Sequence, residues 1–414
     1  MISIYTGVTG LNSHQQAVDV IANNIANVDT VGFKSGRANF QEALSQTLRA
    51  ATAASGGYGA RNPMQLGLGS GIGSIDNLMT QGNLKATGNT MDVAIQGNGF
   101  FLLSDGTSEY LTRNGAFALD ADNRLISAGT GMAVLGWQAD PVTGVVPTEQ
   151  MVTPSSSINI PIGVMSVAKA SENVAYQANL DATATAGTVV NTSAYVYDSL
   201  GAQHRVDIAL TRTATDNQWD CAASSPDADP AVPGSAGTLI FDANGQITTP
   251  TFDLSLTLLN PGGATSPLDA KLSFAAVTQL AGASNVQAVS QDGLAMGTLQ
   301  SFSIDENGII TGTFTNGMFR TLGQISLARF ANPAGLTKAG SSLWKTSVAS
   351  GPAAIVWPST GDAGKLASGY LEMSNVDLAT EFANLIVTQR GFQANSRVIT
   401  TSDEMLQDLL TIKR

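Results

Sequence analysis

Few side chains in this 414-residue chain could act as general bases, nucleophiles or metal ligands. Its two histidines are His14 and His204, and its one cysteine is Cys221. One cysteine can neither close an intramolecular disulfide nor supply a cysteine zinc cluster, and two histidines offer little for acid–base or metal chemistry. His204, beside Gln203 and Arg205, is expected to be a lone exposed histidine. We therefore expect no catalytic residue, metal or cofactor, and no enzyme.

Two segments partly match ligand-binding motifs, and both depart from them where the chemistry matters. Residues 359–366 end like a phosphate loop, but Ser359 replaces the first glycine and Leu366 the hydroxyl that would reach magnesium. Asp120 and Asp122 open like a calcium loop, but Leu125 stands at its glycine position, so we expect a hairpin turn. The sequence leaves open a carboxylate pair, which would make the chain an extracellular hydrolase.

The charge of the chain argues against two classes of partner. Acidic residues outnumber basic ones 32 to 20, which gives a net charge of −12. Nucleic acids and anionic membranes both select basic surfaces, so we expect neither as a partner. The first thirty residues hold no Lys or Arg, and we expect no cleaved signal peptide.

The first thirty residues carry a heptad pattern of apolar side chains. The positions alternate by four and three from residue 4 to residue 25. In order they hold Ile4, Val8, Leu11, Gln15, Val18, Ala22 and Ile25. This spacing predicts a helix that packs in a coiled coil.

The same alternation runs from residue 378 to residue 410, after Ser374 and Asp377, which fit a capping box. These positions hold Leu378, Phe382, Leu385, Gln389, Phe392, Ser396, Ile399, Asp403, Leu406 and Leu410. We expect the two terminal helices to pair as a coiled coil whose large apolar side chains form an assembly core. The predicted core residues are Ile4, Val8, Leu11, Val18, Ile25, Leu378, Phe382, Leu385, Phe392, Ile399, Leu406 and Leu410.

Both helices carry more apolar surface than a single partner covers. Ile386 and Met405 lie off the heptad positions, and Gly10 and Gly391 each cost a helix roughly 1 kcal/mol relative to Ala. One interpretation is an ordinary helix pair packed on the protein's own core. The other, which we favour, is that further copies of the chain cover the remaining apolar faces.

The middle of the chain is predicted to be β. Asn-Gly, a strong hairpin signal, recurs at residues 98, 114, 244, 307 and 316. Val206, Ile208 and Leu210 alternate with polar residues, as in a half-buried strand. The fold class is therefore mixed and mostly β, with discontinuous antiparallel β domains between two terminal helices.

Changes in composition divide the chain into four parts. We expect a helical assembly domain from 1–30 and 371–414, and an extended linker from 31–75 and 361–370. An inner β domain would combine 76–147 with 289–360, and an outer β domain would span 148–288 as an insertion.

Residues 23–34 read NNIANVDTVGFK, which resembles the signature of the bacterial flagellar rod and hook protein family. The signature residues are Asn23, Asn24, Asn27, Thr30, Gly32 and Phe33. Physically, the asparagines can cap the end of a helix, Thr30 and Gly32 can turn the chain, and Phe33 can anchor it. Three further segments are similar to that family: 96–101, 111–117 and 374–410.

The long middle favours the hook members of this family over the shorter distal rod subunits. Residues 195–201, YVYDSLG, resemble the outer domain of hook members. The resemblance implies a structural subunit that self-assembles into a curved helical tube, a flexible universal joint that transmits torque from motor to filament.

The same resemblance implies the partners and the location. The main partner would be the chain itself, and the others would be the distal rod protein, the hook cap protein, the hook–filament junction proteins and the flagellar type III export apparatus. The protein would lie in the extracellular hook. The alternatives are a distal rod subunit and, in a different class, a secreted β-rich adhesin or glycan-binding protein. An adhesin would need clustered aromatic side chains, whereas the four tryptophans are scattered in sequence.

Overall fold

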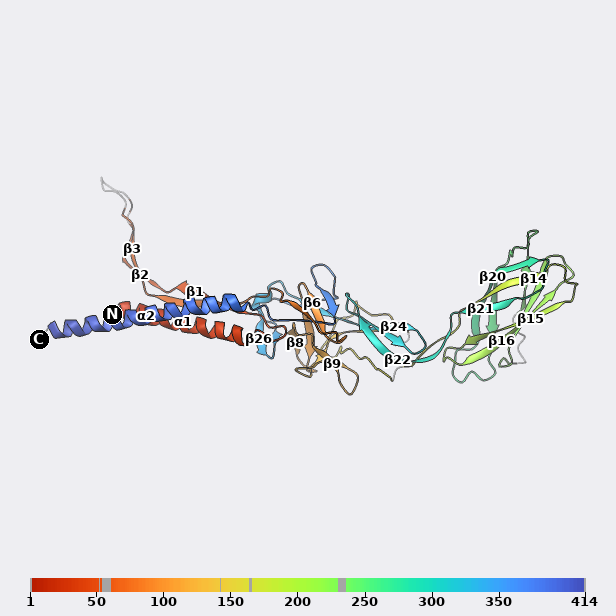
Figure 1. Ribbon diagram of the computed structural model, residues 1–414, viewed down its shortest axis with the longest axis horizontal. Helices are drawn as coiled ribbons and strands as arrows, with labels where there is room; N and C mark the ends of the chain where they lie inside the picture. The colour runs from red at the N-terminus through yellow and green to blue at the C-terminus, as the bar shows by residue number, and fades with distance from the viewer. Residues whose placement is uncertain are drawn as a thin grey trace. The chain divides into compact units, whose positions relative to one another are not determined.

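The computed structural model describes residues 2–51, 53, 61–141, 143–163, 166–229 and 236–412 (Figure 1). These residues form two compact units. The first unit contains the residues up to 160, together with 303–311 and those from 321 onward, and the second contains 161–302 and 312–320. The chain thus leaves the first unit, builds the second and returns. Two helices, at the two ends of the chain, flank a mostly β interior, which confirms the predicted fold class.

The helices of the first unit are α1 (Ile2–Ala26) and α2 (Leu378–Ile412). None of the helices in the described part of the chain is long and apolar enough to cross a bilayer. Next to them lie two antiparallel pairs, β1 (Gly36–Glu42) with β4 (Ser70–Asn77) and β2 (Ser45–Arg49) with β3 (Met64–Gly67).

These four strands fall almost wholly within 31–75, where composition predicted an extended linker. Backbone hydrogen bonds, which composition does not reveal, order this segment into ladders. Ser13 also donates from Oγ to the Ser70 carbonyl at 3.0 Å, which ties β4 to α1. The stretch therefore contains a folded arm beside the helix.

The β part of the first unit is one nine-stranded sheet with short pairs around it. Its apolar core includes Phe100, Leu102, Trp137 and Trp344. The sheet contains β7 (Phe100–Ser104), β8 (Glu109–Thr112), β9 (Phe117–Leu119), β10 (Leu125–Ser127), β11 (Ala133–Val134), β25 (Leu327–Arg329), β26 (Thr337–Gly340), β27 (Leu343–Lys345) and β28 (Ala354–Val356). The short pairs are β5 (Leu84–Ala86) with β30 (Tyr370–Glu372) and β6 (Val93–Gln96) with β29 (Lys365–Ser368). A 3-10 turn, η1, spans Pro333–Gly335, and β12 (Gly136–Gln138) pairs with the end of β24 (Phe319–Ile325).

The second unit contains two four-stranded sheets around a shared apolar core. Val206, Ile208 and Leu210 point into this core, as their alternation predicted. Strand β14 runs parallel to β20, whereas the other pairs in these two sheets are antiparallel. One sheet contains β14 (Asn173–Asp181), β19 (Thr251–Leu256), β20 (Leu268–Leu280) and β21 (Gln287–Gln291). The other contains β15 (Val189–Tyr197), β16 (Gln203–Arg212), β17 (Gln218–Ser224) and β18 (Ala236–Ile240).

Three further strands lie where the chain passes between the two units. They are β13 (Ser166–Lys169), which pairs with β22 (Leu294–Ile304), and β23 (Ile309–Phe314).

The Asn-Gly prediction is confirmed in part. The pairs at 307 and 316 turn between consecutive strands, and the pair at 244 turns between Phe241 and Ile247, with a positive φ at each glycine. The pairs at 98 and 114 are not hairpins, because the strands on either side of each pair, β6 with β7 and β8 with β9, are not hydrogen-bonded to each other. Gly115 is needed for another reason, since a Cβ there would overlap the Val93 carbonyl.

Candidate assembly interface

Helices α1 and α2 lie side by side and antiparallel (Figure 1). At one end, the hydroxyls of Ser3 and Ser402 are 3.4 Å apart. At the other end, Nδ2 of Asn24 donates to Oε1 of Glu381 at 2.9 Å. The two ends of the chain thus form one element, although the whole β part separates them in sequence.

Small residues form the contact face of α1. Its buried positions are three or four residues apart, so they line one face of the helix. They are Gly7, Gly10, Ser13, Ala17, Ile21 and Asn24. A Cβ on Gly10 would lie 2.8 Å from Nδ2 of Asn395, and a Cβ on Gly391 of α2 would lie 2.5 Å from the His14 ring. The glycines that interrupt the helical pattern are therefore points where the two helices approach closely.

The predicted apolar positions of α1 lie beside this contact face rather than on it. Val8 is 49% exposed. The other four are only partly buried: Ile4, Leu11, Val18 and Ile25. Gly7 and Gly10, which a hydrophobicity pattern ignores, lie against Ile399 and Asn395 of α2.

The predicted positions of α2 divide between two faces. Leu385, Phe392 and Ile399 are partly buried. Phe382 is 51% exposed, and Leu378 and Leu406 are exposed as well, while the side chain of Leu410 lies outside the described residues. Four large residues off the heptad are also exposed: Ile386, Val387, Val398 and Met405. A single copy therefore leaves an apolar stripe of α2 facing solvent.

Helix α2 begins with an Asp377 cap. Oδ2 of Asp377 accepts a hydrogen bond from the Thr380 hydroxyl at 2.6 Å, and Oδ1 accepts one from the Ala379 amide at 3.1 Å. The Thr380 hydroxyl bond, more than the amide bond, lowers the pKa of Asp377. Ser374 is not the cap that the predicted capping box requires. Its hydroxyl accepts a hydrogen bond from the Val376 amide, which lies before the start of the helix. The first helical residue is Leu378, so the N-cap, which is the residue before it, is Asp377.

The signature residues fix the end of α1. The Asn24 amide makes a reciprocal pair with the backbone of Gly36, donating at 2.8 Å and accepting at 2.9 Å. Asn27 donates to both oxygens of Asn23, and Thr30 donates to Asn27. Asn24 therefore fastens the returning chain to α1, while the other two asparagines close the helix end.

Gly32 turns the chain toward the sheet. It has a φ of +69°, and its amide donates to the Glu372 carbonyl at 2.7 Å. A Cβ there would lie 2.7 Å from the Asn114 amide nitrogen, so both the backbone conformation and the space favour glycine. The half-buried Phe33 follows.

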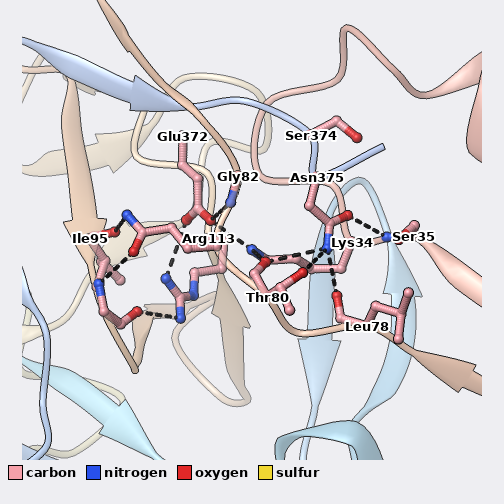
Figure 2. A network of polar contacts seen from close by, with 12 residues as sticks. Lys34, Ser35, Leu78, Thr80, Gly82, Ile95, Arg113, Glu372, Ser374 and Asn375 are labelled. Carbon is pink, nitrogen blue, oxygen red and sulfur yellow. Dashed lines mark hydrogen bonds and ion pairs between the residues drawn. The ribbon is translucent and has the colours of Figure 1, made fainter. Parts of the chain in front are cut away.

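Sequence reasoning missed a buried ionic network at the base of the helix pair (Figure 2). Oε1 of Glu372 accepts hydrogen bonds from Nζ of Lys34 at 2.6 Å and from the Gly82 amide at 2.9 Å, and Oε2 accepts from Arg113 at 3.2 Å. Burial lowers the pKa of Lys34 despite the carboxylate beside it. Lys34 and Arg113 lie in two of the segments that resemble the family, 23–34 and 111–117. Two basic residues in a sequence do not indicate which carboxylate they will share.

Asn375 extends the network toward α2. Its Nδ2 donates to the Leu78 carbonyl at 2.8 Å and to the Thr80 hydroxyl at 3.0 Å, and its Oδ1 accepts from the Ser35 amide at 2.8 Å (Figure 2). The strand before α2 is thus held to the turn after α1 by side chain to backbone bonds.

The histidine, the cysteine and the aspartates first considered for chemistry take part in ion pairs, the apolar core and a turn. His204 is not the lone exposed histidine that we expected, since its ring nitrogens face Asp198 and Asp227 at 3.3 and 3.2 Å. Burial raises the pKa of Cys221 to about 12. Asp120 accepts backbone amides in the β9–β10 hairpin, as predicted. Among the described residues, no three His, Cys, Asp or Glu side chains gather to hold a metal ion.

The tryptophans do not form an exposed platform. Trp137, Trp219 and Trp344 are at most 5% exposed, and Trp357 is 40% exposed. Stacking on a sugar ring needs an accessible aromatic face, which three of these four side chains do not present.

Family models match four segments of the chain. They are described as "Flagella basal body rod protein" (residues 4–34), "Flagellar hook protein FlgE/F/G D1 domain" (94–174), "Flagellar basal body protein FlaE D2 domain" (168–294) and "Flagellar basal body rod FlgEFG protein C-terminal" (367–412). Together they include most of both helices and parts of both units.

The chain is also similar to whole proteins. It is 38% identical to a flagellar hook protein of Borreliella burgdorferi and 39% identical to one of Treponema pallidum, with full coverage of both chains in each case. A solved hook protein structure from Helicobacter pylori matches with a TM-score of 0.48 at 15% identity, covering 70% of this chain and all of that one.

Proposed function

The chain belongs to the flagellar hook protein family, and we propose that it is a structural subunit of the bacterial flagellar hook. In this role many copies self-assemble into a curved helical tube, a flexible universal joint that passes torque from motor to filament. The observation that carries the proposal is the terminal helix pair. The buried face of α1 consists mostly of small residues. Large side chains of α2, such as Phe382 and Val387, remain exposed in a single copy.

The helix pair would form the cohesive core of the tube. Exposed apolar surface is stabilised when a second copy covers it, at about 25 cal/mol per Å² of surface removed from water. Head-to-tail contacts between unlike surfaces generate an open helical polymer when the rotation between copies does not close a ring. The predicted assembly domain, 1–30 and 371–414, would supply this core, and the coiled-coil residues would contact neighbouring copies.

The β parts would supply the flexibility. The second unit has an apolar core of its own, and the outward-facing side chains of β16 are mostly polar. Contacts between such surfaces are polar and hydrated, and they exchange partners at low cost. We propose that the predicted outer domain, 148–288, lets neighbouring subunits slide past one another as the tube bends. The predicted inner domain, 76–147 with 289–360, would be intermediate between this mobile part and the cohesive core.

The remaining partners are other flagellar components. We propose the distal rod protein below the hook, the hook–filament junction proteins above it, the cap protein during growth, and the type III export apparatus as the route outward. An extracellular position and export without a cleaved signal peptide belong to the same proposal, which rests on the family.

Negative-stain microscopy of the purified protein under polymerising conditions tests the function. Curved tubes are the expected result. Straight tubes would favour a distal rod subunit, and the absence of any polymer would contradict the proposal.

The sliding role has a test of its own. Deleting 148–288 should leave a chain that still polymerises, but into tubes with altered curvature. Complete loss of assembly would show that this region does more than tune bending.

A further inference from the structure

A pocket of about 320 Å³ lies where α1 ends and the β26–β27 hairpin begins. Phe33 and Trp344 supply aromatic walls, and Asn23 and Asn27 supply polar ones. We call it the Lys338 pocket, after the charged side chain that lines it. The signature turn thus forms one side of a cavity as well as closing a helix.

The Lys338 pocket holds a cation that no carboxylate of the described residues pairs with. Nζ of Lys338 lies 5.1 Å from the ring centroid of Phe33 and 5.4 Å from that of Trp344, and its hydrogen bond, at 3.5 Å, goes to the Lys34 carbonyl. Burial lowers the pKa of Lys338. Lys338 is exposed, so its cation, held over two aromatic rings, is open to an opposite charge from another molecule.

A second group in the same pocket also lacks a partner. Trp344 is 3% exposed, and its Nε1–H has no hydrogen-bond acceptor among the described residues. The exposed cation beside aromatic walls fits an anion with an apolar neighbour. A carboxylate on an amphipathic helix has that chemistry.

The opposite end of the helix pair presents such a segment. Ser402 is level with Ser3 near the start of α1, so residues 403–412 of α2 extend beyond it by roughly 15 Å at 1.5 Å per residue (Figure 1). We call these residues the overhang. Met405 and Leu406 are exposed on it. Its acidic residues, also exposed, are Asp403, Glu404 and Asp408.

We propose that the Lys338 pocket receives a carboxylate from the overhang of a second copy of this chain. The inference rests on the proposed function, because a growing tube brings the unlike ends of successive copies together. Glu404 and Asp408 are four residues apart and share one helix face, so they are the side chains we assign to the contact. Met405, about 60° around the helix from Asp408, then lies against the rim of the same neighbour.

Charge reversal with rescue tests the contact in the full-length chain. We expect Lys338→Glu, and separately Glu404→Lys with Asp408→Lys, to raise the critical concentration for polymerisation about tenfold or more, because each places like charges together. The chain that carries all three changes should polymerise near the wild-type concentration. The controls are Lys345→Glu, in the same hairpin over Tyr110, and Asp19→Lys on α1.

Sedimentation gives the critical concentration, and circular dichroism confirms that each monomer is folded. The overhang variant changes only exposed helix positions, so it tests the contact even if Lys338→Glu disturbs the pocket. Tubes that form equally well from both reversed variants would overturn this inference and leave the proposed function intact, as would a triple variant that fails to recover. A wild-type chain that forms no tubes would overturn both.

Discussion

Lys34 and Glu372 lie 338 positions apart, yet Nζ of the lysine is 2.6 Å from Oε1 of the glutamate, and neither side chain is exposed. Arg113 reaches the other carboxylate oxygen at 3.2 Å. One buried anion thus joins the turn after α1, the end of β8 and the strand before α2. The network holds the base of the helix pair to the sheet, where torque would have to pass.

Replacing Glu372 with Gln should destabilise the first unit. The substitution leaves the cations of Lys34 and Arg113 buried without a carboxylate, at a cost of about 3–5 kcal/mol of unfolding free energy. Urea unfolding, followed by tryptophan fluorescence in a Trp219→Phe background, reports on the first unit. Glu306→Gln is the control, since it removes an exposed pair with Lys365 and should change little. Equal effects of the two variants would refute a special role for the buried network.

Removing the Asp377 cap should fray the start of α2. The pKa of Asp377 is lowered in the folded chain, so its contribution is present above the ordinary value of 3.8 and is lost as the pH falls through the folded value. Asp377→Ala should remove this pH dependence and speed amide exchange at residues 379–381. Asp19→Ala, a change within α1, should leave exchange at those residues unaltered; an identical exchange pattern in the two variants would contradict the cap.

The two faces of α2 should respond differently to a charge. Phe382 is exposed, so Phe382→Asp should leave the monomer folded while it blocks polymerisation. Leu385 is partly buried, so Leu385→Asp should also loosen the helix pair. Helical content by circular dichroism separates the two effects, and electron microscopy scores assembly. Normal tubes from Phe382→Asp would remove this residue from the interface.

A larger side chain at Gly10 should push the helices apart. Gly10→Leu would bring a Cβ to within 2.8–2.9 Å of the Asn395 amide group, with three further carbons beyond it. Overpacking of this kind typically costs 1–3 kcal/mol. The control is Ala22→Leu on the exposed side of α1. The helical signal on heating should be lost at a lower temperature for Gly10→Leu only, and matching curves would show that the approach is not tight.

The soluble subunit should protect its ends weakly against hydrogen exchange. Ordering a residue costs ~1–2 kcal/mol, and the small side chains between α1 and α2 bury little apolar surface to offset that cost. Amides at residues 4–25 and 378–410 should therefore exchange faster than those of β14–β17, whose core is complete. Strong protection of both helices in the monomer would mean that they do not need neighbouring copies.

Local patterns in the sequence were enough to predict both helices, one half-buried strand and the family. Heptad spacing placed both helices, alternation at Val206, Ile208 and Leu210 placed a strand with its buried face, and the NNIANVDTVGFK segment indicated the family. These features follow from local periodicity and from short motifs, which need no knowledge of distant residues.

The tertiary structure alone decided which residues meet. Gly7 and Gly10 of α1 lie close to α2, an approach that depends on both helices together, while the assembly role of the predicted apolar residues stays a prediction. The linker prediction for 31–75 did not include the pairing of β1 with β4 and of β2 with β3. The amino-acid composition of a segment does not show which backbone groups will pair. Glu372, Lys34 and Arg113 are ordinary charges in the sequence, and only the fold removes them from water and makes them one network.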